Sequence, residues 1–341
     1  MDVIVLGSNR PRDRFYRGGR KITDFRGDPP AGEREPEDWV GSTTALAGED
    51  ALGVTVLPDG RSLPDVIAAE PEAWLGRAHL DRYGADTKLL VKLLDAGQRL
   101  PVHAHPHVDF AGRHLGRAHG KAEAWYIVDG GEIYLGLRED VTAAELEALV
   151  LKQDVDRLLG LLHRIEVRPG DVVYVPPGVL HAIGAGVFLV EVQEPEDLSI
   201  LLEWRDFELD GTHDGHLGLG FDLALEAVER RGRTDQEVRD LIRSTGFGPS
   251  ILPTAADPYF ILERVALDGQ TTINPGFAIL VVLTGEATAG RTEPGEAQAG
   301  GGEIGAGLRL GAGTTTLIPY GAGPVSLQGR GELLVCRPPR P

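Results

Sequence analysis

The chain has 341 residues, of which 42% are hydrophobic and 25% charged, the composition of an ordinary globular protein long enough for two domains. Its formal net charge of −18 argues against sequence-independent binding to nucleic acid, which depends on clustered Lys and Arg. The single cysteine, Cys336, excludes an internal disulfide and favours a reducing compartment. The sequence shows neither a signal peptide nor a membrane span, so we expect a cytoplasmic protein without a membrane partner.

The first 45 residues are rich in Arg, Gly and Pro, and only residues 3–6 have the character of a strand. Residues 63–75 predict a short helix. The apolar run at residues 88–95, which ends before Gly97, predicts a strand buried on both faces, although its periodicity alone also admits a helical turn.

Two histidines follow Pro101 and lie two positions apart in the chain. Residues at this spacing in a strand point to the same face, so His103 and His105 should project together, and Lys121 and Glu123 should do the same. A third histidine, His181, closes the segment Pro-Pro-Gly-Val-Leu-His. Imidazole and carboxylate groups suit a borderline-soft divalent metal, so we predict a metal site at His103, His105, Glu123 and His181.

Plainer interpretations remain for several of these residues. The two histidines of the pair could be structural or exposed to solvent, and Glu123 could simply form an ion pair with Lys121. Trp125 is expected in the core. The remaining histidines of the nearby loop are expected to be solvated; they are His107, His114 and His119.

Short strands with turns between them continue after Glu123 and favour a mostly antiparallel β architecture. The predicted strands cover residues 133–137, 165–175 and 187–192. Between them, Thr142-Ala-Ala-Glu145 has the form of a capping box and predicts an amphipathic helix over residues 142–162, inserted between strands.

Helical character returns at residues 221–243, where Thr234-Asp-Gln-Glu237 forms a second capping box. The chain then becomes a series of short strands and glycine-rich turns, which we interpret as a second, smaller β-barrel or sandwich without metal ligands. The predicted strands are residues 259–266, 277–283, 314–318 and 332–336, and residues 287–313 are predicted to be turns and loops.

The spacing of the site residues is specific. Gly97 is followed by five residues and the His103-Ala-His105 pair, and Glu123 is followed by six residues and Gly130; Gly170 is followed by five residues, Pro-Pro-Gly178, two residues and His181. This spacing resembles the two motifs of the cupin barrel. The resemblance implies a mainly β fold with a cupin (jelly-roll) barrel domain, helical insertions and a smaller C-terminal β-domain. We expect a metal-binding domain at residues 1–220, a helical segment at 221–247 and a metal-free cupin-like domain at 248–341.

The residues around these motifs resemble one cupin family, the type I phosphomannose isomerases, over roughly residues 15–210. The matching segments are Leu93-Leu-Asp-Ala, Val-His-Ala-His-Pro, Gly120-Lys-Ala-Glu-Ala-Trp-Tyr, Arg168-Pro-Gly-Asp, Pro-Pro-Gly-Val-Leu-His181, Val190-Glu-Val-Gln193, and Trp39 with Ser42. The resemblance implies a metal-dependent aldose-ketose isomerase that interconverts mannose 6-phosphate and fructose 6-phosphate through an enediol. It also implies one zinc ion, with Mn, Fe, Co or Ni not excluded, and a small sugar or sugar phosphate as the binding partner.

Residue by residue, the resemblance makes His105, Glu123 and His181 zinc ligands and places His103 where the family has Gln. Imidazole is at least as good a zinc ligand, so this change should preserve the site. Lys121 matches the family's active-site lysine. Glu191 matches an acid near the sugar, so these two residues are the candidates for acid–base work.

The sequence departs from the family after Glu191, where a Ser-Asp pair and, four residues later, a catalytic Arg are replaced by Glu196-Asp197 and Leu201. Loss of such a charge-stabilising donor typically costs about 100-fold or more in rate. Candidate substrate-contacting residues on this stretch are Gln193, Glu196 and Arg205, although Arg205 would enter the site only with a shift of register. Two alternatives therefore remain: an isomerase of an unphosphorylated or differently charged sugar, and a non-catalytic sugar-binding or regulatory cupin. The oligomeric state is left open.

Overall fold

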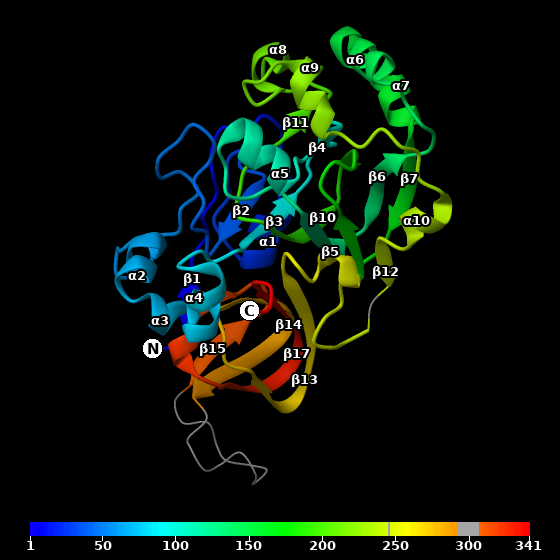
Figure 1. The fold of residues 1–341 in the computed structure, drawn as a ribbon. Coiled ribbons are helices and arrows are strands. Elements are labelled where there is room, and N and C mark those ends of the chain that lie inside the picture. Colours follow the sequence, from blue (N-terminus) through cyan, green and yellow to red (C-terminus); the bar gives the residue numbers. More distant parts are fainter. Residues whose placement is uncertain (245, 292–306) are drawn as a thin grey trace.

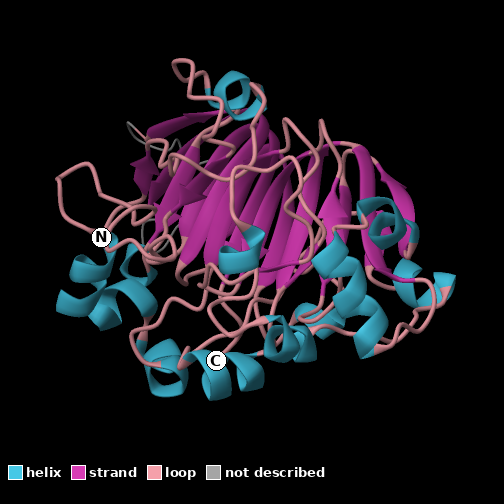
Figure 2. Ribbon diagram, turned by 90° about the horizontal axis from the view of Figure 1, so that it is seen from above, coloured by secondary structure: helices cyan, strands magenta, loops and turns pink. Residues whose placement is uncertain are grey.

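Three antiparallel sheets form the framework of the protein, as a computed structural model shows for residues 1–244, 246–291 and 307–341. The strands gather in the middle of the molecule and the helices lie around its periphery (Figure 2). The predicted mainly β fold class is therefore confirmed. The residue limits proposed for the individual domains stay a prediction.

Sheet I carries one wall of the candidate site. Its order is β12-β8-β5-β10-β3-β2. The strands are β2 (Glu37–Val40), β3 (Leu90–Asp95), β5 (Glu123–Asp129), β8 (Asp171–Val175), β10 (Phe188–Gln193) and β12 (Ile242–Ser244). Every residue of the neighbouring strands β3 and β10 is buried, which explains why both are almost continuous apolar runs. The strand interpretation of residues 88–95 is confirmed for Leu90–Asp95, and the helical alternative is wrong there.

Sheet II carries the opposite wall, in the order β11-β4-β9-β6-β7. Its strands are β4 (His103–Ala104), β6 (Gly131–Leu137), β7 (Leu162–Val167), β9 (His181–Ile183) and β11 (Ile200–Leu201). The imidazole of His181 in sheet II lies 3.2 Å from the carboxylate of Glu123 in sheet I, so the two sheets face each other across the site. Trp125 is fully buried on the same face as Glu123, as expected for a core residue.

Sheet III contains most of the C-terminal strands and also the N-terminal strand. Its order is β1-β16-β14-β17-β13, with β15 paired to β14. The strands are β1 (Ile4–Leu6), β13 (Ile261–Ile273), β14 (Ala278–Arg291), β15 (Leu308–Gly311), β16 (Thr315–Ile318) and β17 (Val325–Arg337). In Figure 1 this sheet occupies the bottom of the view. Three of the predicted strands were too short, because β13 and β14 each pair with β17 over long stretches and tolerate glycines within these ladders.

The prediction of turns and loops at 287–313 is accordingly wrong where β14 and β15 extend into it, and residues 292–306 lie outside the described residues. Within the described residues, the histidine triad of the candidate site is the group of potential metal ligands that was found.

The helices are shorter than the sequence predicted. They are α1 (Lys21–Arg26), α2 (Leu63–Ala69), α3 (Pro71–Leu75), α4 (Arg77–Tyr83), α5 (Val108–Phe110), α6 (Ala143–Lys152), α7 (Val155–Gly160), α8 (Gly211–Asp214), α9 (Phe221–Ala224) and α10 (Asp235–Arg239), with single turns η1 (Ala111–Leu115), η2 (Leu225–Ala227), η3 (Thr254–Ala256) and η4 (Tyr320–Ala322). The helix predicted over 142–162 divides at Gln153, whose φ of 52° is left-handed, and Asp154 caps the second part. Pro71 similarly begins a new helix within 63–75, because a proline cannot continue one.

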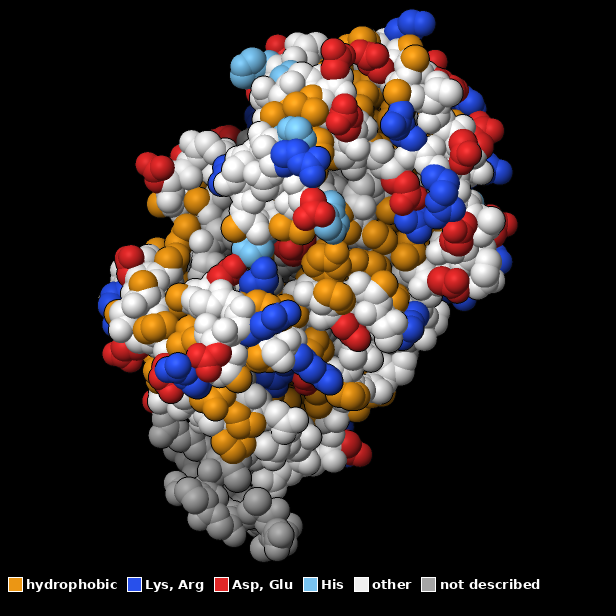
Figure 3. Space-filling model, in the orientation of Figure 1, with side chains coloured by type: hydrophobic (Ala, Val, Ile, Leu, Met, Phe, Trp, Pro, Cys, Tyr) orange, Lys and Arg blue, Asp and Glu red, His pale blue; other side chains and the backbone are white. Residues whose placement is uncertain are grey.

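The helical region predicted at 221–243 consists of α9, η2 and α10, followed by strand β12. The capping box at Thr234 is confirmed, since its hydroxyl and the Glu237 carboxylate each accept a backbone N–H of the other residue. No described helix has the length and apolar character needed to cross a membrane. Acidic and basic side chains are interspersed on the face drawn in Figure 3.

Gly97 is required where the N-terminal segment crosses the end of β3. A Cβ atom on Gly97 would lie 2.1 Å from the carbonyl oxygen of Gly18 and 2.6 Å from the amide nitrogen of Gly19. Backbone atoms cannot move aside cheaply, so we expect Gly97→Ala to lower the free energy of unfolding by about 1–3 kcal/mol or more. Denaturant unfolding would measure this loss. Gly160→Ala is the matched control, because a Cβ at this helical position meets nothing within 4 Å; equal midpoints for the two variants would contradict the prediction.

Candidate metal centre

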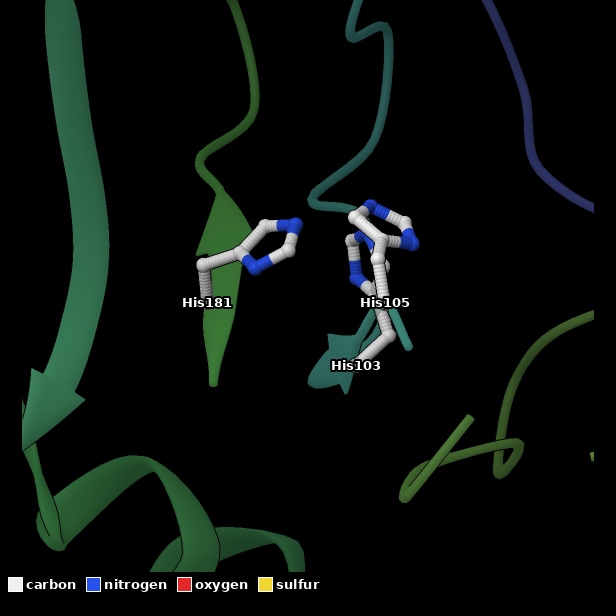
Figure 4. A group of neighbouring side chains, drawn as sticks. All are labelled: His103, His105 and His181. Carbon is white, nitrogen blue, oxygen red and sulfur yellow. The ribbon is translucent and has the colours of Figure 1, made fainter. Parts of the chain in front are cut away.

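Three histidines meet between the two facing sheets. His103 belongs to β4 and His105 follows that strand directly, while His181 begins β9 and pairs with His103 across the ladder. Their potential ligand atoms all lie within 4.8 Å of one another. Figure 4 shows the imidazoles turned toward one another, and all three side chains are buried. The prediction that the histidine pair projects together with His181 is confirmed.

Backbone carbonyls orient all three rings. The Nδ1 atoms of His103, His105 and His181 lie 2.8, 2.7 and 2.9 Å from carbonyl oxygens, those of Pro101, Leu198 and Val179 respectively. A carbonyl oxygen only accepts, so each Nδ1 must carry the hydrogen, which leaves the lone pair of a neutral ring on Nε2. In metal-binding histidines, a hydrogen bond from one ring nitrogen typically fixes the tautomer so that the other nitrogen can bind the metal. The Nδ1 contacts of these three rings have this form.

Glu123 begins β5 in sheet I and faces the histidines. Its Oε2 atom lies 2.9 Å from His105 Nε2, and its Oε1 atom lies 3.2 Å from His181 Nε2 and accepts a hydrogen bond from Trp125 Nε1. Burial favours the protonated acid, but His105 and the Lys121 ammonium outweigh it and hold the pKa of Glu123 well below its usual value. The carboxylate is therefore ionised and available as a ligand.

The donor set fits a divalent metal ion. His105 Nε2, His181 Nε2 and Glu123 Oε2 are buried, and none has a hydrogen-bond partner of suitable geometry, although they lie close together. Buried polar atoms rarely stay unpaired, and lone pairs that converge on one point are satisfied by a cation. Burial lowers the pKa of His103 well below its usual value and that of His105 to about 3, so both rings stay neutral at neutral pH.

A polar row crosses sheet I beside the metal ligands. In the sheet register, Trp39 of β2 opposes Lys92 of β3, Lys92 opposes Glu191 of β10, and Glu191 opposes Trp125 of β5. Side chains of opposed residues point to the same face. The neighbouring row on that face pairs Gln193 with Glu123, so strand register alone places Lys92 and Glu191 next to the candidate metal ligand Glu123.

Glu191 is 3% exposed, and its Oε1 atom has no hydrogen-bond partner. The Lys92 ammonium lies 3.6 Å from that oxygen. Burial, reinforced by the negative charge of Glu123, raises the pKa of Glu191 to about 7. A carboxyl group that titrates near neutrality inside a cavity has the property expected of a general base.

The predicted lysine also lies at the site. Lys121 is 5% exposed, and its ammonium lies 3.3 Å from Glu123 Oε2, so the ion pair considered from the sequence is present. This contact does not exclude metal binding, since the other lone pairs of the carboxylate face the histidines. Both lysines, Lys92 and Lys121, line one inner cavity together with His103 and Glu191.

The candidate substrate residues after Glu191 fall in three different places. The side-chain amide of Gln193 donates to the backbone oxygens of Glu194 and Glu196, so it shapes the loop. Glu196 lines an outer cavity of about 380 Å³, 4.0 Å from Arg117. Arg205 is exposed, bonds to Gln153 at the junction of α6 and α7, and is not brought to either cavity.

The prediction that His119 is solvated is wrong. Its side chain is only 7% exposed, and Nε2 lies 2.7 Å from the carboxylate of Asp86 while Nδ1 lies 3.0 Å from the Lys88 ammonium. It lines the outer cavity, which shares Asp197 with the inner one. His107 is exposed and His114 half-buried.

Several polar and charged residues of the inner cavity were not identified from the sequence. Lys92 is the single charged residue in the apolar run at residues 89–94, and this isolated charge could have identified it as a candidate site residue. The others come from the N-terminal segment and the 196–197 turn, namely Arg14, Tyr16, Glu37 and Asp197. The N-terminal segment was expected to contain no strand after residue 6. In the structure, β2 pairs with β3 and carries Glu37 to the site.

Leu201, which stands where the family has an arginine, is buried in β11 directly opposite His103. Arg14 approaches the inner cavity from another direction, with NH2 3.6 Å from Asp197. The cationic groups of the cavity therefore come from β3, the segment before β5 and the N-terminal segment.

Comparison with known proteins finds mannose-6-phosphate isomerases that are similar to nearly the whole chain. No family model matches the sequence. The chain is 29% identical over 331 residues to the mannose-6-phosphate isomerase ManA of Bacillus subtilis, covering 93% of this chain and 94% of that protein. It is 32% identical over 207 residues to the mannose-6-phosphate isomerase of Streptococcus mutans, covering 59% of each.

The fold is shared with solved structures. The mannose 6-phosphate isomerase of Bacillus subtilis superposes with a TM-score of 0.71 at 22% identity, covering 99% of this chain and 100% of that one. A variant of the phosphomannose isomerase of Salmonella typhimurium gives a TM-score of 0.73 at 17% identity, with 99% and 100% coverage. Over nearly its whole length, the chain is therefore similar in sequence to mannose-6-phosphate isomerases and shares its fold with solved phosphomannose isomerases.

Proposed function

We propose that the protein is a metal-dependent mannose-6-phosphate isomerase that interconverts mannose 6-phosphate and fructose 6-phosphate. The observation that carries this proposal is the arrangement between the two sheets, where a buried set of ligand atoms lies beside a buried carboxyl group of raised pKa. Near full-length relatives named for this activity support it. The reaction moves a proton between C2 and C1 of the sugar through an enediol, which requires a base and stabilisation of negative charge on oxygen.

His103, His105, Glu123 and His181 would hold the metal. Three nitrogens and one carboxylate suit zinc, and the same set also accepts Mn, Fe, Co or Ni. When bound, the ion would favour negative charge on the sugar's carbonyl or hydroxyl oxygens. The surrounding residues keep the ligand rings neutral and exclude bulk water, because all four side chains are at most 7% exposed.

Glu191 is the proposed base. Its oxygen faces the cavity unpaired, and Lys92 on the adjacent strand lies close enough to stabilise the ionised form. Lys121 points into the same cavity and is proposed to contact the substrate. Both lysines carry several donors on a flexible stem and can follow an oxygen whose charge changes during proton transfer.

The charge of the cavity suits an anionic sugar only with the metal in place. Three cationic side chains, Arg14, Lys92 and Lys121, line the cavity. They are balanced by the carboxyl groups of Glu37, Glu123, Glu191 and Asp197. A divalent ion tips this balance toward positive charge, so we expect it to favour binding of a phosphorylated sugar as well as the chemical step.

Metal removal tests the ligand assignment. We expect purified protein to contain about one divalent ion per chain, and a chelator to lower both the melting temperature and the activity, because ligand-binding energy adds to folding energy. His181→Ala should lose most of the bound metal by elemental analysis. His213→Ala is the control, since its ring lies at the surface beside Asp214. Equal metal content in the two variants would contradict the assignment.

A substrate comparison tests the reaction. We expect isomerisation of mannose 6-phosphate to fructose 6-phosphate, with exchange of the transferred proton into solvent, and much lower kcat/KM for mannose because the phosphate is lost as an anchor. Coupled enzymatic assay and proton NMR in D₂O would measure both. Binding of mannose 6-phosphate without turnover by the metal-loaded protein would refute the proposal.

The pH dependence tests the base. A base must be deprotonated to act, so kcat/KM should rise with pH as Glu191 ionises. Burial and the charge of Glu123 raise the pKa of Glu191 to about 7, and a bound cation would offset the charge of Glu123. The acid limb of the pH profile should therefore lie at or below about pH 7. We expect Glu191→Gln to lower kcat by about 10²–10⁴-fold and to remove this limb. An unchanged acid limb in the residual activity would exclude Glu191 as the base.

A further inference from the structure

Glu37, the first residue of β2, is a buried carboxylate for which the proposed reaction has no role. It is 3% exposed, and three donors surround it: Tyr16 Oη at 2.5 Å, Trp39 Nε1 at 2.6 Å and Arg14 Nε at 3.2 Å. These contacts outweigh the effect of burial and lower the pKa of Glu37, so the group stays ionised. A negative charge is thus held in one position by three separate side chains.

Lys92 lies between this carboxylate and the proposed base. Its ammonium is 3.5 Å from Glu37 Oε2 and 3.6 Å from Glu191 Oε1, and it lies over the Trp39 ring, 4.7 Å from the ring centroid. The same Trp39 ring donates its N–H to Glu37. A lysine has a long stem with many rotamers, so two opposed anions and an aromatic face are what confine it.

The position of the Lys92 ammonium determines whether Glu191 Oε1 keeps a lone pair that can accept a proton. At 3.6 Å, Lys92 stabilises the charge of Glu191 without a hydrogen bond, and Glu191 Oε1 keeps an unpaired lone pair. Without the opposing charge of Glu37, the ammonium would be drawn to Glu191 and occupy that lone pair. Asp197 also attracts the ammonium, but less strongly than Glu37 and Glu191 do.

We propose that Glu37 is a positioning residue that acts through Lys92, holding the ammonium at ion-pair distance so that the Glu191 oxygen stays free to accept the substrate proton. This inference rests on the proposed isomerase function. It predicts an effect on the chemical step rather than on substrate binding, because Glu37 would act on the substrate only through Lys92. A purely structural role, in which Glu37 merely balances buried cations, predicts lost stability without a selective effect on kcat.

A double-mutant cycle separates these roles. The four proteins are the wild type, Glu37→Gln, Lys92→Met and the double variant, each loaded with the same metal and assayed with mannose 6-phosphate. We expect Glu37→Gln to lower kcat by about 10- to 100-fold while KM changes little, since displacing one catalytic group by about 1 Å has effects of this size. In the Lys92→Met background, Glu37→Gln should have no further effect on kcat.

The matched control is Glu33→Gln, an exposed acid of the same N-terminal segment whose ion pair with Arg17 lies at the surface. It should keep wild-type kcat and KM. If Glu37→Gln does not fold, Tyr16→Phe removes one donor to Glu37 and leaves every charge in place. This variant should show a smaller fall in kcat that disappears in the Lys92→Met background.

Wild-type kcat in Glu37→Gln, or in Tyr16→Phe where that variant replaces it, would overturn the inference. Independent, multiplicative losses in the double variant would also overturn it, since they would show that Glu37 does not act through Lys92. A metal-loaded wild type that fails to isomerise mannose 6-phosphate would instead contradict the proposed function, and the inference would fall with it.

Discussion

The site depends on the burial of many charged groups between two facing sheets. A buried charge is tolerated only when it is paired, because leaving water costs several kcal/mol per ion. Lys121 therefore pairs with Glu123, Lys92 with Glu37 and Glu191, and Arg14 with Glu37 and Asp197. His105 Nε2, His181 Nε2 and Glu123 Oε2 are buried close together without a hydrogen-bond partner, which is the physical basis for proposing a metal there.

Strand register arranges this network for the proposed reaction. Residues opposed across antiparallel strands point to the same face, so one row carries Trp39, Lys92 and Glu191 and the next carries Gln193 and Glu123. The proposed base and the metal ligand Glu123 thus come from neighbouring strands of one sheet. The histidines come from the other sheet, and each is held by a backbone carbonyl. Rigid elements on both sides position the groups between them.

The cationic groups of the cavity come from separate segments of the chain. Leu201 makes the position opposite His103 apolar, while Arg14 enters from the N-terminal segment and Lys92 from β3. In the proposed function, positive charge at the substrate would be supplied by several side chains together with a bound cation. The N-terminal segment therefore contributes to the candidate site as well as to the scaffold, since β2 extends sheet I and brings Glu37 and Trp39 with it.

Much of the metal centre could be predicted from the sequence because its information is local. Alternation along a strand places His103 with His105 and Lys121 with Glu123, and motif spacing adds His181. Element types were also largely predictable, but helix ends and strand lengths were not. Gln153 adopts a left-handed conformation that no pattern indicates, and the long β13, β14 and β17 depend on one another for pairing.

The neighbourhood of Glu191 was decided only by the tertiary structure. Glu37, Lys92 and Glu191 are separated by 55 and 99 residues in the chain, and nothing local states that β2 and β10 flank β3. His119 likewise looked solvated until folding brought Asp86 and Lys88 to it. By itself, the sequence determined which groups could bind a metal, because their spacing follows strand periodicity; the fold decided which charges face one another, because pairing between distant strands sets those distances.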